Sequence, residues 1–229
     1  MRKISTLLLS LGIALSITIP VSANSASVLE SVNLGVSNAV KAAQAAITWK
    51  ECSSLFTRYN QESSNTCGAA CVRMVLKVIN GSAPAESTVF NGIKDKDQPS
   101  TANANNMCAY INNRISSFAY KKYLPESLST FKTKVYNTIV NKHAPVIVLV
   151  QQNLTSTNSG WPTNSIYSHF VVIKAISSDK TKVKIADPAY GKYYEMSIQN
   201  VFNSMHDDYE YRYKSGKWIS YCYLAARDW

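Results

Sequence analysis

The chain has 229 residues, 46% of them hydrophobic and 17% charged, and its formal net charge is +10 at pH 7. This length allows one substantial core or two small lobes and excludes a protein of several domains, while the composition excludes an intrinsically disordered chain. The basic residues are scattered singly and in pairs rather than arranged in a stripe with aromatic residues. We therefore expect weak adsorption to anionic surfaces and no nucleic-acid binding.

Residues 1–23 have the pattern of a secretory signal peptide. The basic pair Arg2-Lys3 precedes a mostly apolar run over residues 4–19, and Pro20-Val21-Ser22-Ala23 ends that run with small side chains. The pattern predicts cleavage after Ala23 and an exported protein. A membrane anchor is the alternative, but the run is short and contains Ser, Thr and Gly.

The remaining sequence divides near residue 48. Residues 24–48 are rich in Ser, Ala and Val and form either an N-terminal extension or a short pro-segment. Residues 49–229 are expected to form one domain. Since no stretch after the signal could span a bilayer, we expect no stable membrane insertion, and we expect a monomer.

The first half of this domain is predicted to be helical. Asn65 or Thr66 caps a helix that runs to about Ile79 and ends at Asn80-Gly81. Cysteines and apolar residues recur along it at three- and four-residue spacing, so one face is buried. A short helical segment within 82–91, a helix at 101–117 and another at 125–141 follow.

The second half changes to a strand pattern. Residues 144–150 are a continuous apolar run, which is typical of a buried strand, and a long polar loop over 151–167 follows. The remaining predicted elements are strands at 169–176, 182–187, 192–196 and 219–224 and a short helix at 197–204. Helices followed by antiparallel strands indicate an α+β protein with two lobes.

The number of cysteines is odd: Cys52, Cys67, Cys71, Cys108 and Cys222. If Cys67 is free, the other four can form two disulfides, and of the three possible pairings we expect Cys71–Cys108 and Cys52–Cys222. A zinc site built from Cys67, Cys71 and Cys108 is the alternative. It lacks the closely paired ligand spacing of zinc modules.

Cys67 and Gln61 form the first part of a candidate catalytic site. At the first turn of its helix, Cys67 lies where unpaired backbone N–H groups and the helix dipole favour a thiolate, which is the nucleophilic form. Gln61 precedes it by a short loop. Its amide can donate, together with the backbone N–H of Cys67, to the oxygen that becomes negative when an acyl carbon turns tetrahedral.

Three histidines are candidates for the base. His143 is expected at the C-terminal end of a helix, where a cation is favourable without any catalytic role. His206 is flanked by Asp207-Asp208, as at a solvated helix end. His169 begins an apolar strand, where a solvated side chain is less expected, and is therefore the preferred base.

Asp187 is the candidate that orients this histidine. If the hairpin turn is centred near Ser178, Asp187 lies opposite His169 or within one position of it, and its carboxylate can accept the imidazole N–H. A one-residue slip in register would instead place the two side chains on opposite faces. The alternative is that Asp187-Pro188 is a turn that merely ends the strand.

The motifs carry a resemblance that covers roughly residues 58–205. They are Gln61…Cys67-Gly68-Ala69-Ala70, Ser168-His169-Phe170-Val171-Val172, Ala186-Asp187-Pro188-Ala189-Tyr190-Gly191 and the run from Glu195 to Phe202. In this order they resemble papain-like cysteine peptidases typified by bacteriocin-leader (double-glycine) processing domains. The resemblance implies a papain-like fold, in which a helical lobe carries the cysteine and an antiparallel sheet lobe carries the histidine and the aspartate.

The resemblance also implies the role of each residue. Cys67 is the nucleophile, His169 the base and then the acid, Asp187 the group that orients it, and Gln61 the oxyanion donor; no metal or organic cofactor is expected. The sequence departs from the family in having Ala69 where Pro is frequent, and in being itself exported, whereas well-known members are domains of membrane exporters.

The sequence therefore predicts a secreted cysteine peptidase that acts on peptides or proteins. Two alternatives remain open. The first is a cell-wall peptide hydrolase or acyltransferase of the same architecture, and the second is a catalytically silent binding or effector module with the same fold.

Overall fold

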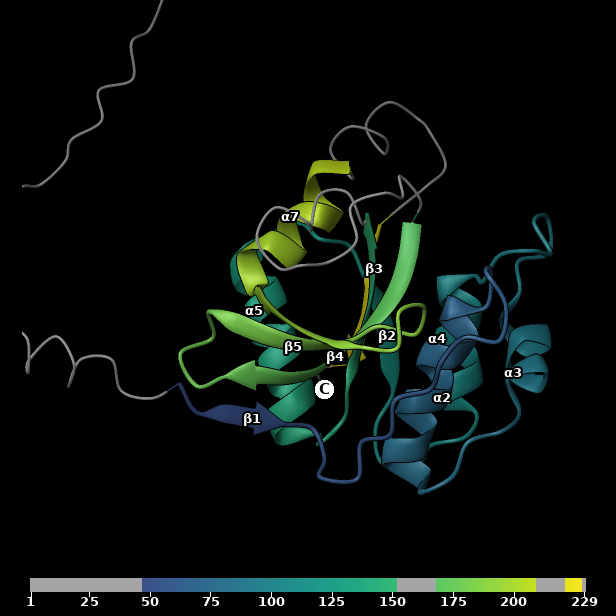
Figure 1. The fold of residues 1–229 in the computed structure, drawn as a ribbon, viewed down its shortest axis with the longest axis horizontal. Helices are drawn as coiled ribbons and strands as arrows, with labels where there is room; N and C mark the ends of the chain where they lie inside the picture. Colours follow the sequence, from purple (N-terminus) through teal and green to yellow (C-terminus); the bar gives the residue numbers. More distant parts are fainter. Residues whose placement is uncertain (1–46, 152–167, 209–220, 228–229) are drawn as a thin grey trace, which may run out of the picture. The chain divides into compact units, whose positions relative to one another are not determined.

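The computed structural model describes residues 47–151, 168–208 and 221–227, all within one compact unit of the chain, Ile47–Trp229 (Figure 1). The helices are α2 (Cys67–Asn80), α3 (Glu86–Ile93), α4 (Ala104–Asn112), α5 (Leu128–Tyr136), the short π-helix η1 (Asn137–Asn141) and α7 (Ile198–Asp208). The strands are β1 (Trp49–Glu51), β2 (Tyr120–Tyr123), β3 (Val146–Gln151), β4 (Ser168–Ser177), β5 (Lys182–Ala186), β6 (Tyr193–Ser197) and β7 (Tyr223–Ala226).

The strands form one antiparallel sheet in the order β2-β7-β3-β4-β5-β6, and β1 pairs with the end of β4. Strand β4 is the centre of this sheet. Its first half is bonded to β3, and its second half is bonded to β5 on one side and to β1 on the other. The backbone at the start of β4, where the candidate base lies, is therefore fixed by a continuous ladder with β3.

A helical layer covers each face of the sheet (Figure 1). Alternate residues of β3 belong to different cores: Val146 and Val148 join the core under α5, η1 and α7, whereas Ile147 joins the core under α2, α3 and α4. This alternation follows from the period of two along a strand. Buried on both faces, β3 needs the uninterrupted apolar sequence by which it was predicted.

Helix α2 and the α+β class agree with the sequence prediction. The helix ends at Asn80, and Gly81 adopts a left-handed conformation with φ 73°, as a glycine C-cap does. Helix α4 begins later than predicted because the Asn103 side chain caps it, accepting hydrogen bonds from the backbone N–H groups of Asn105 and Asn106, and it also ends earlier, at Asn112.

The sequence prediction missed β1 and β2 and placed the last strand too early. Both missed strands are short, and their outward side chains include Lys50 and Lys121, so neither shows an apolar run. The last strand begins at Tyr223 rather than at residue 219, and the predicted bounds at 219–220 lie outside the described residues. The polar loop predicted after β3 likewise falls almost entirely on residues that the structure does not describe.

Neither predicted disulfide, Cys71–Cys108 nor Cys52–Cys222, is present: all five cysteines lie in the described ranges and are free. Cys52 belongs to the core under α5 and α7, whereas Cys222 belongs to the core under α2 to α4, so these two residues lie in different cores. The sequence does not reveal which face of a sheet each cysteine occupies. Cysteine count alone therefore misled the assignment.

Two further structural properties concern metals and membranes. Within the described ranges, no three His, Cys, Asp or Glu side chains are grouped so that they could hold a metal ion. In the same part of the chain, no helix combines the length and the apolar character needed to cross a bilayer.

Candidate active site

Cys67 is the first residue of α2 and is partly exposed, whereas the helix residues that follow it are mostly buried. Gly68 explains how this end of the helix reaches the sheet. A Cβ at residue 68 would lie 2.6 Å from the Cβ of Ala102 and 3.4 Å from the Phe170 ring of β4. Only glycine permits this approach, which brings Cys67 to the start of β4.

Thr66 occupies the N-cap position of α2 but does not cap it with its side chain, in contrast to the sequence prediction. Its hydroxyl oxygen instead accepts from the backbone N–H of Ser63 at 3.1 Å and donates to the Ser63 carbonyl at 2.9 Å. Among the described residues, no side chain caps α2. The first-turn N–H groups around Cys67 are thus left to interact with a negatively charged group.

The side chains of His169 and Asp187 form a buried hydrogen bond. Nε2 of His169 lies 2.8 Å from Oδ1 of Asp187, and the aspartate is fully buried. The same carboxylate oxygen accepts the backbone N–H of Ala189 at 2.7 Å. This second bond fixes the carboxylate in the turn that follows β5, so it holds the imidazole in one orientation.

The register that brings this pair together differs from the predicted one. The ladder between β4 and β5 ends with Val172 paired to Ala186, so its continuation places Asp187 opposite Val171, two residues from His169. A hairpin centred later than predicted and a bulge in β4 account for the difference. Because a shift of two residues keeps side chains on one face, the pair meets diagonally.

His169 also interacts with Cys67, and its pKa reflects both neighbours. Burial alone would lower the pKa of His169, but hydrogen bonds to Asp187 and Cys67 and the charges of these two groups raise it from 6.5 to about 9. Since Nε2 faces Asp187, Nδ1 is the ring nitrogen left for the thiol. The imidazole therefore holds a proton at neutral pH, as a thiolate–imidazolium pair requires.

The other four cysteines are poor nucleophiles. Burial raises the pKa of Cys52, Cys108 and Cys222 to about 12, and it also raises the pKa of Cys71. Among the five cysteines, all of which are described, only Cys67 is partly exposed. Cys67 is thus the cysteine that a substrate can reach.

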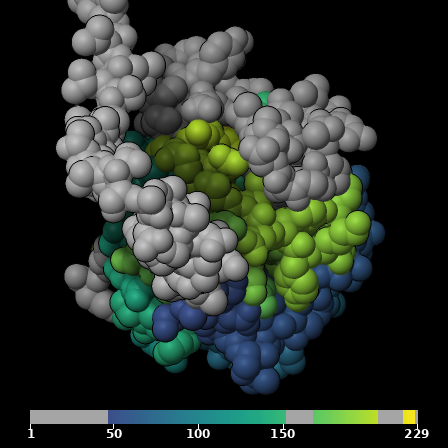
Figure 2. Space-filling view, turned by 60° about the vertical axis from the view of Figure 1, so that its left-hand side comes forward, coloured from purple at the N-terminus to yellow at the C-terminus, as the bar shows by residue number. Residues whose placement is uncertain are grey.

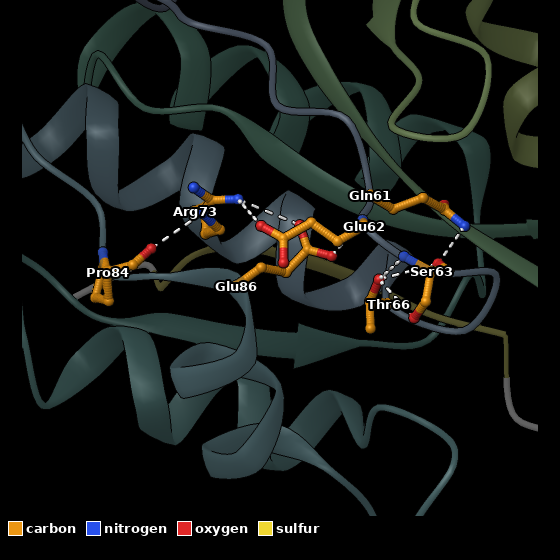
Figure 3. A network of polar contacts seen from close by, with 7 residues as sticks. All are labelled: Gln61, Glu62, Ser63, Thr66, Arg73, Pro84 and Glu86. Atoms are coloured by element: carbon orange, nitrogen blue, oxygen red, sulfur yellow. Dashed lines mark hydrogen bonds and ion pairs between the residues drawn. The ribbon is translucent and has the colours of Figure 1, made fainter.

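Gln61 is tied to the turn that holds Asp187. Its backbone N–H donates to the Pro188 carbonyl at 3.0 Å. Its side-chain Nε2 donates to the Ser63 carbonyl at 2.8 Å, as Figure 3 shows. The amide nitrogen retains a second N–H, while Oε1 is buried and has no hydrogen-bond partner in the described structure. The residue can therefore offer one N–H to a reacting oxygen.

The segment before α2 packs against β6 as well. On the face shown in Figure 2, atoms from the early part of the chain (blue) lie against atoms from the region of β5 and β6 (light green), and the rings of Phe56 and Tyr193 are 6.5 Å apart. Residues that precede Cys67 and residues that follow Asp187 thus share one surface.

The remaining histidines take no part in this site. His143 is exposed and follows η1 with a positive φ of 50°. His206 lies in α7, but its side chain falls outside the described structure. Of the predicted site residues, the structure joins Cys67, His169 and Asp187 by direct interactions, and it bonds the backbone of Gln61 to Pro188, the residue after Asp187.

Sequence reasoning missed two groups that support the site. One is the backbone N–H of Ala189, which has no signature in a sequence. The other is the carboxylate of Glu86, which is buried and accepts the backbone N–H of Glu62, next to Gln61, at 2.6 Å. An acidic residue in the first turn of a short helix is so common that it gave no signal.

A helix that begins with a cysteine, packed against an antiparallel sheet that positions a histidine and an aspartate, is the arrangement of a papain-like cysteine peptidase. The sequence matches the Peptidase_C39 like family over residues 54–217, which is most of the chain. The chain belongs to this family and is a cysteine peptidase, that is, a hydrolase. The resemblance inferred from the motifs is thereby confirmed.

The solved structures that are similar to this chain include a peptidase domain and an avirulence protein. The peptidase domain of Streptococcus ComA, a bi-functional ABC transporter involved in a quorum-sensing pathway, is 16% identical with a TM-score of 0.42, over 75% of this chain and 99% of that domain. The Pseudomonas avirulence protein AvrPphB is 11% identical with a TM-score of 0.33, over 75% and 96% of the two chains. No curated protein sequence matches the chain.

Proposed function

We propose that this chain is a secreted peptidase that cleaves peptide bonds with Cys67 as nucleophile, His169 as base and acid, Asp187 as the group that orients it, and Gln61 as oxyanion donor. One observation carries the proposal. His169, buried at the start of β4, interacts with Asp187 on one side and with Cys67 on the other. A histidine so placed can move a proton between a thiol and a substrate.

The first half of the reaction forms an acyl-enzyme. The Cys67 thiolate attacks the peptide carbonyl carbon, a C–S bond forms, and the carbonyl oxygen becomes an oxyanion. The side-chain N–H of Gln61 and the backbone N–H of Cys67 stabilise that oxyanion. Protonated His169 then donates its proton to the leaving amine as the C–N bond breaks, which leaves a thioester on Cys67.

The second half releases the acyl group. Now neutral, His169 takes a proton from a water molecule, whose oxygen attacks the thioester carbon. The C–S bond breaks, the carboxylic acid product departs, and the thiolate–imidazolium pair returns. Asp187 keeps its hydrogen bond to Nε2 through both halves, so Nδ1 always faces the sulfur and the substrate.

Cleavage of a peptide library tests this proposal. We expect the mature protein to cleave a subset of peptides, and we expect Cys67→Ser to abolish that cleavage. Cys108→Ala is a matched control, because Cys108 is a free, buried cysteine on α4 and not on the helix of Cys67, and this variant should retain the cleavage pattern. Full activity of Cys67→Ser, or the absence of any cleaved peptide, would overturn the assignment.

Export rests on the signal-peptide pattern of residues 1–23. We expect the protein in the culture medium with Asn24 as its first residue, or with a later residue if 24–48 is a pro-segment that is also removed. Mass spectrometry of the secreted N-terminus measures this directly. Retention of the intact N-terminus in the cell would contradict export.

A further inference from the structure

We propose that Glu86 is a positioning residue: its buried carboxylate, paired with Arg73, holds the backbone beside Gln61 so that the Gln61 amide meets the developing oxyanion. The inference rests on the oxyanion role proposed for Gln61. It assigns a catalytic purpose to an ion pair that touches neither Cys67 nor His169.

The Glu86 carboxylate occupies an unusual place for an acidic side chain. It lies in the first turn of α3, yet only 1% of the residue is exposed. Oε1 accepts the backbone N–H of Glu62 at 2.6 Å, and Oε2 pairs with Nη1 of Arg73 at 3.3 Å (Figure 3). A charge this deeply buried is costly unless it is both paired and hydrogen-bonded, and Glu86 meets both conditions.

Arg73, on α2, holds the same segment from a second side. Its Nε donates to the Pro84 carbonyl at 3.0 Å, and its guanidinium lies over the Tyr59 ring, 4.3 Å from the centroid. Nη1 also lies 3.5 Å from the Glu62 carboxylate. Tyr59 and Glu62 flank Gln61 in the sequence, so the arginine holds both ends of the segment that carries the oxyanion donor.

Side chains and single backbone bonds thus fix the segment from Tyr59 to Ser63. Arg73 holds Tyr59, the Pro188 carbonyl holds Gln61, and Glu86 holds Glu62. The Ser63 carbonyl, which accepts from the Gln61 amide, is itself bound by Thr66. A shift of Glu62 would therefore pass through one peptide unit to the amide of Gln61, where small displacements are expensive for catalysis.

A buried ion pair is weak evidence for a purely stabilising role, because apolar residues of similar volume often stabilise as well or better. What the pair supplies is a fixed position for the backbone that it binds. The carboxylate offers two oxygens at fixed positions, one to a backbone N–H and one to an arginine that is itself held by α2 and the Pro84 carbonyl. The oxyanion segment is thereby fixed to the helix that presents the nucleophile.

The test uses Glu86→Gln and a peptide identified by the library screen. The glutamine amide has one acceptor oxygen, so it cannot serve both the Glu62 N–H and Arg73. We expect kcat to fall about tenfold while KM changes less than twofold, because misplacing an oxyanion donor affects the transition state and not the bound substrate. An unchanged kcat in a folded variant would overturn the proposal.

A double-mutant cycle with Gln61→Ala shows whether Glu86 acts through Gln61. In the Gln61→Ala background, Glu86→Gln should have no further effect on kcat. If the two losses multiply, Glu86 does not act through Gln61 and the inference fails, whereas the proposed peptidase mechanism stands. If Gln61→Ala alone leaves kcat unchanged, the oxyanion assignment itself is wrong and the inference falls with it.

Alkylation of Cys67 by iodoacetamide separates positioning from general damage. Alkylation builds no oxyanion, so its rate in Glu86→Gln should equal that of the wild type, and a large fall would overturn a role confined to Gln61. Glu195→Gln is the matched control, because it breaks an exposed ion pair in which Glu195 lies 2.9 Å from Lys182. We expect this control to leave kcat unchanged. If Glu86→Gln does not fold, Arg73→Lys replaces it in the double-mutant cycle with Gln61→Ala. We then expect the same loss of kcat, absent in the Gln61→Ala background, and an unchanged kcat would overturn the proposal in the same way.

Discussion

The two halves of the candidate site are held in different ways. His169 lies within the hydrogen-bond ladder of the sheet, and Asp187 follows β5 directly. Their positions are therefore set by backbone hydrogen bonds, which do not depend on the identity of the side chains. Gln61 lies in a segment without ladder bonds and depends on specific side chains, namely Arg73, Glu86 and Thr66. The strand-held half should thus tolerate changes in its surroundings, whereas the loop-held half should be sensitive to residues that are far from the substrate.

The largest expected effect comes from removing the buried carboxylate of the strand-held half. Asp187→Ala deprives His169 and Ala189 of their shared acceptor, so kcat should fall on the order of 10³-fold. Peptide cleavage under saturating substrate measures this loss. Asp97→Ala, at an exposed position, is the matched control with wild-type kcat; a loss below tenfold for Asp187→Ala would show that the ladder alone orients the imidazole.

A smaller effect is expected at the contact between α2 and the sheet. Gly68→Ala forces a Cβ to within 2.6 Å of Ala102, and such overpacking costs roughly 1–3 kcal/mol while it displaces Cys67. We expect lower stability in urea unfolding together with a several-fold lower kcat.

Gly81→Ala is the matched control for that variant. It strains a left-handed residue at the far end of the same helix, at a cost of about 1 kcal/mol, with nothing within 4 Å of the new Cβ. It should lower stability without changing kcat. Equal effects of both substitutions on kcat would mean that helix stability, and not the placement of Cys67, limits the reaction.

The smallest expected effect is a shift in pH dependence. In the proposed mechanism protonated His169 is the acid, and its pKa is raised to about 9, so kcat/KM should fall as the pH rises through about 9. Asp187→Asn keeps an acceptor but removes the charge, which lowers the pKa of His169 and moves this alkaline limb to lower pH. If the alkaline limb of the pH profile does not move, the charge of Asp187 does not set the pKa of His169.

The same pKa shift links pH to stability. Because the folded protein binds the His169 proton more tightly than the unfolded chain, this histidine stabilises the fold fully below pH 6.5, and its contribution is lost as the pH rises towards 9. Urea unfolding of the wild type at several pH values should show that decline, and Asp187→Asn should show less of it.

The sequence predicted residues of both halves, including Gln61, but it did not predict the contacts that hold Gln61 in place. Apolar runs predicted β3 and β4, and a glycine C-cap predicted the end of α2. The order of the motifs predicted that Cys67, His169 and Asp187 belong to one site. The register could not be foreseen, because the bulge in β4 depends on packing that no local pattern reports. Glu86 was missed because its partners, Glu62 and Arg73, are meaningful only once α2 and α3 are packed together.

The assignment of the cysteines failed for a related reason. Disulfide frameworks are expected in small exported domains whose cores are too limited to hold them together. Here the sheet has a core on both faces, and four of the cysteines serve as small apolar residues in those cores.

Burying those four thiols has a practical consequence for anyone handling the protein. The fold contains no covalent crosslink among its described residues that dithiothreitol could open, so a reductant can keep Cys67 from oxidising without loosening the scaffold around it. Because Cys67 is the one cysteine that is not buried, it also offers a single attachment point for a thiol-reactive tag, with which the amount of active enzyme in a crude preparation can be measured.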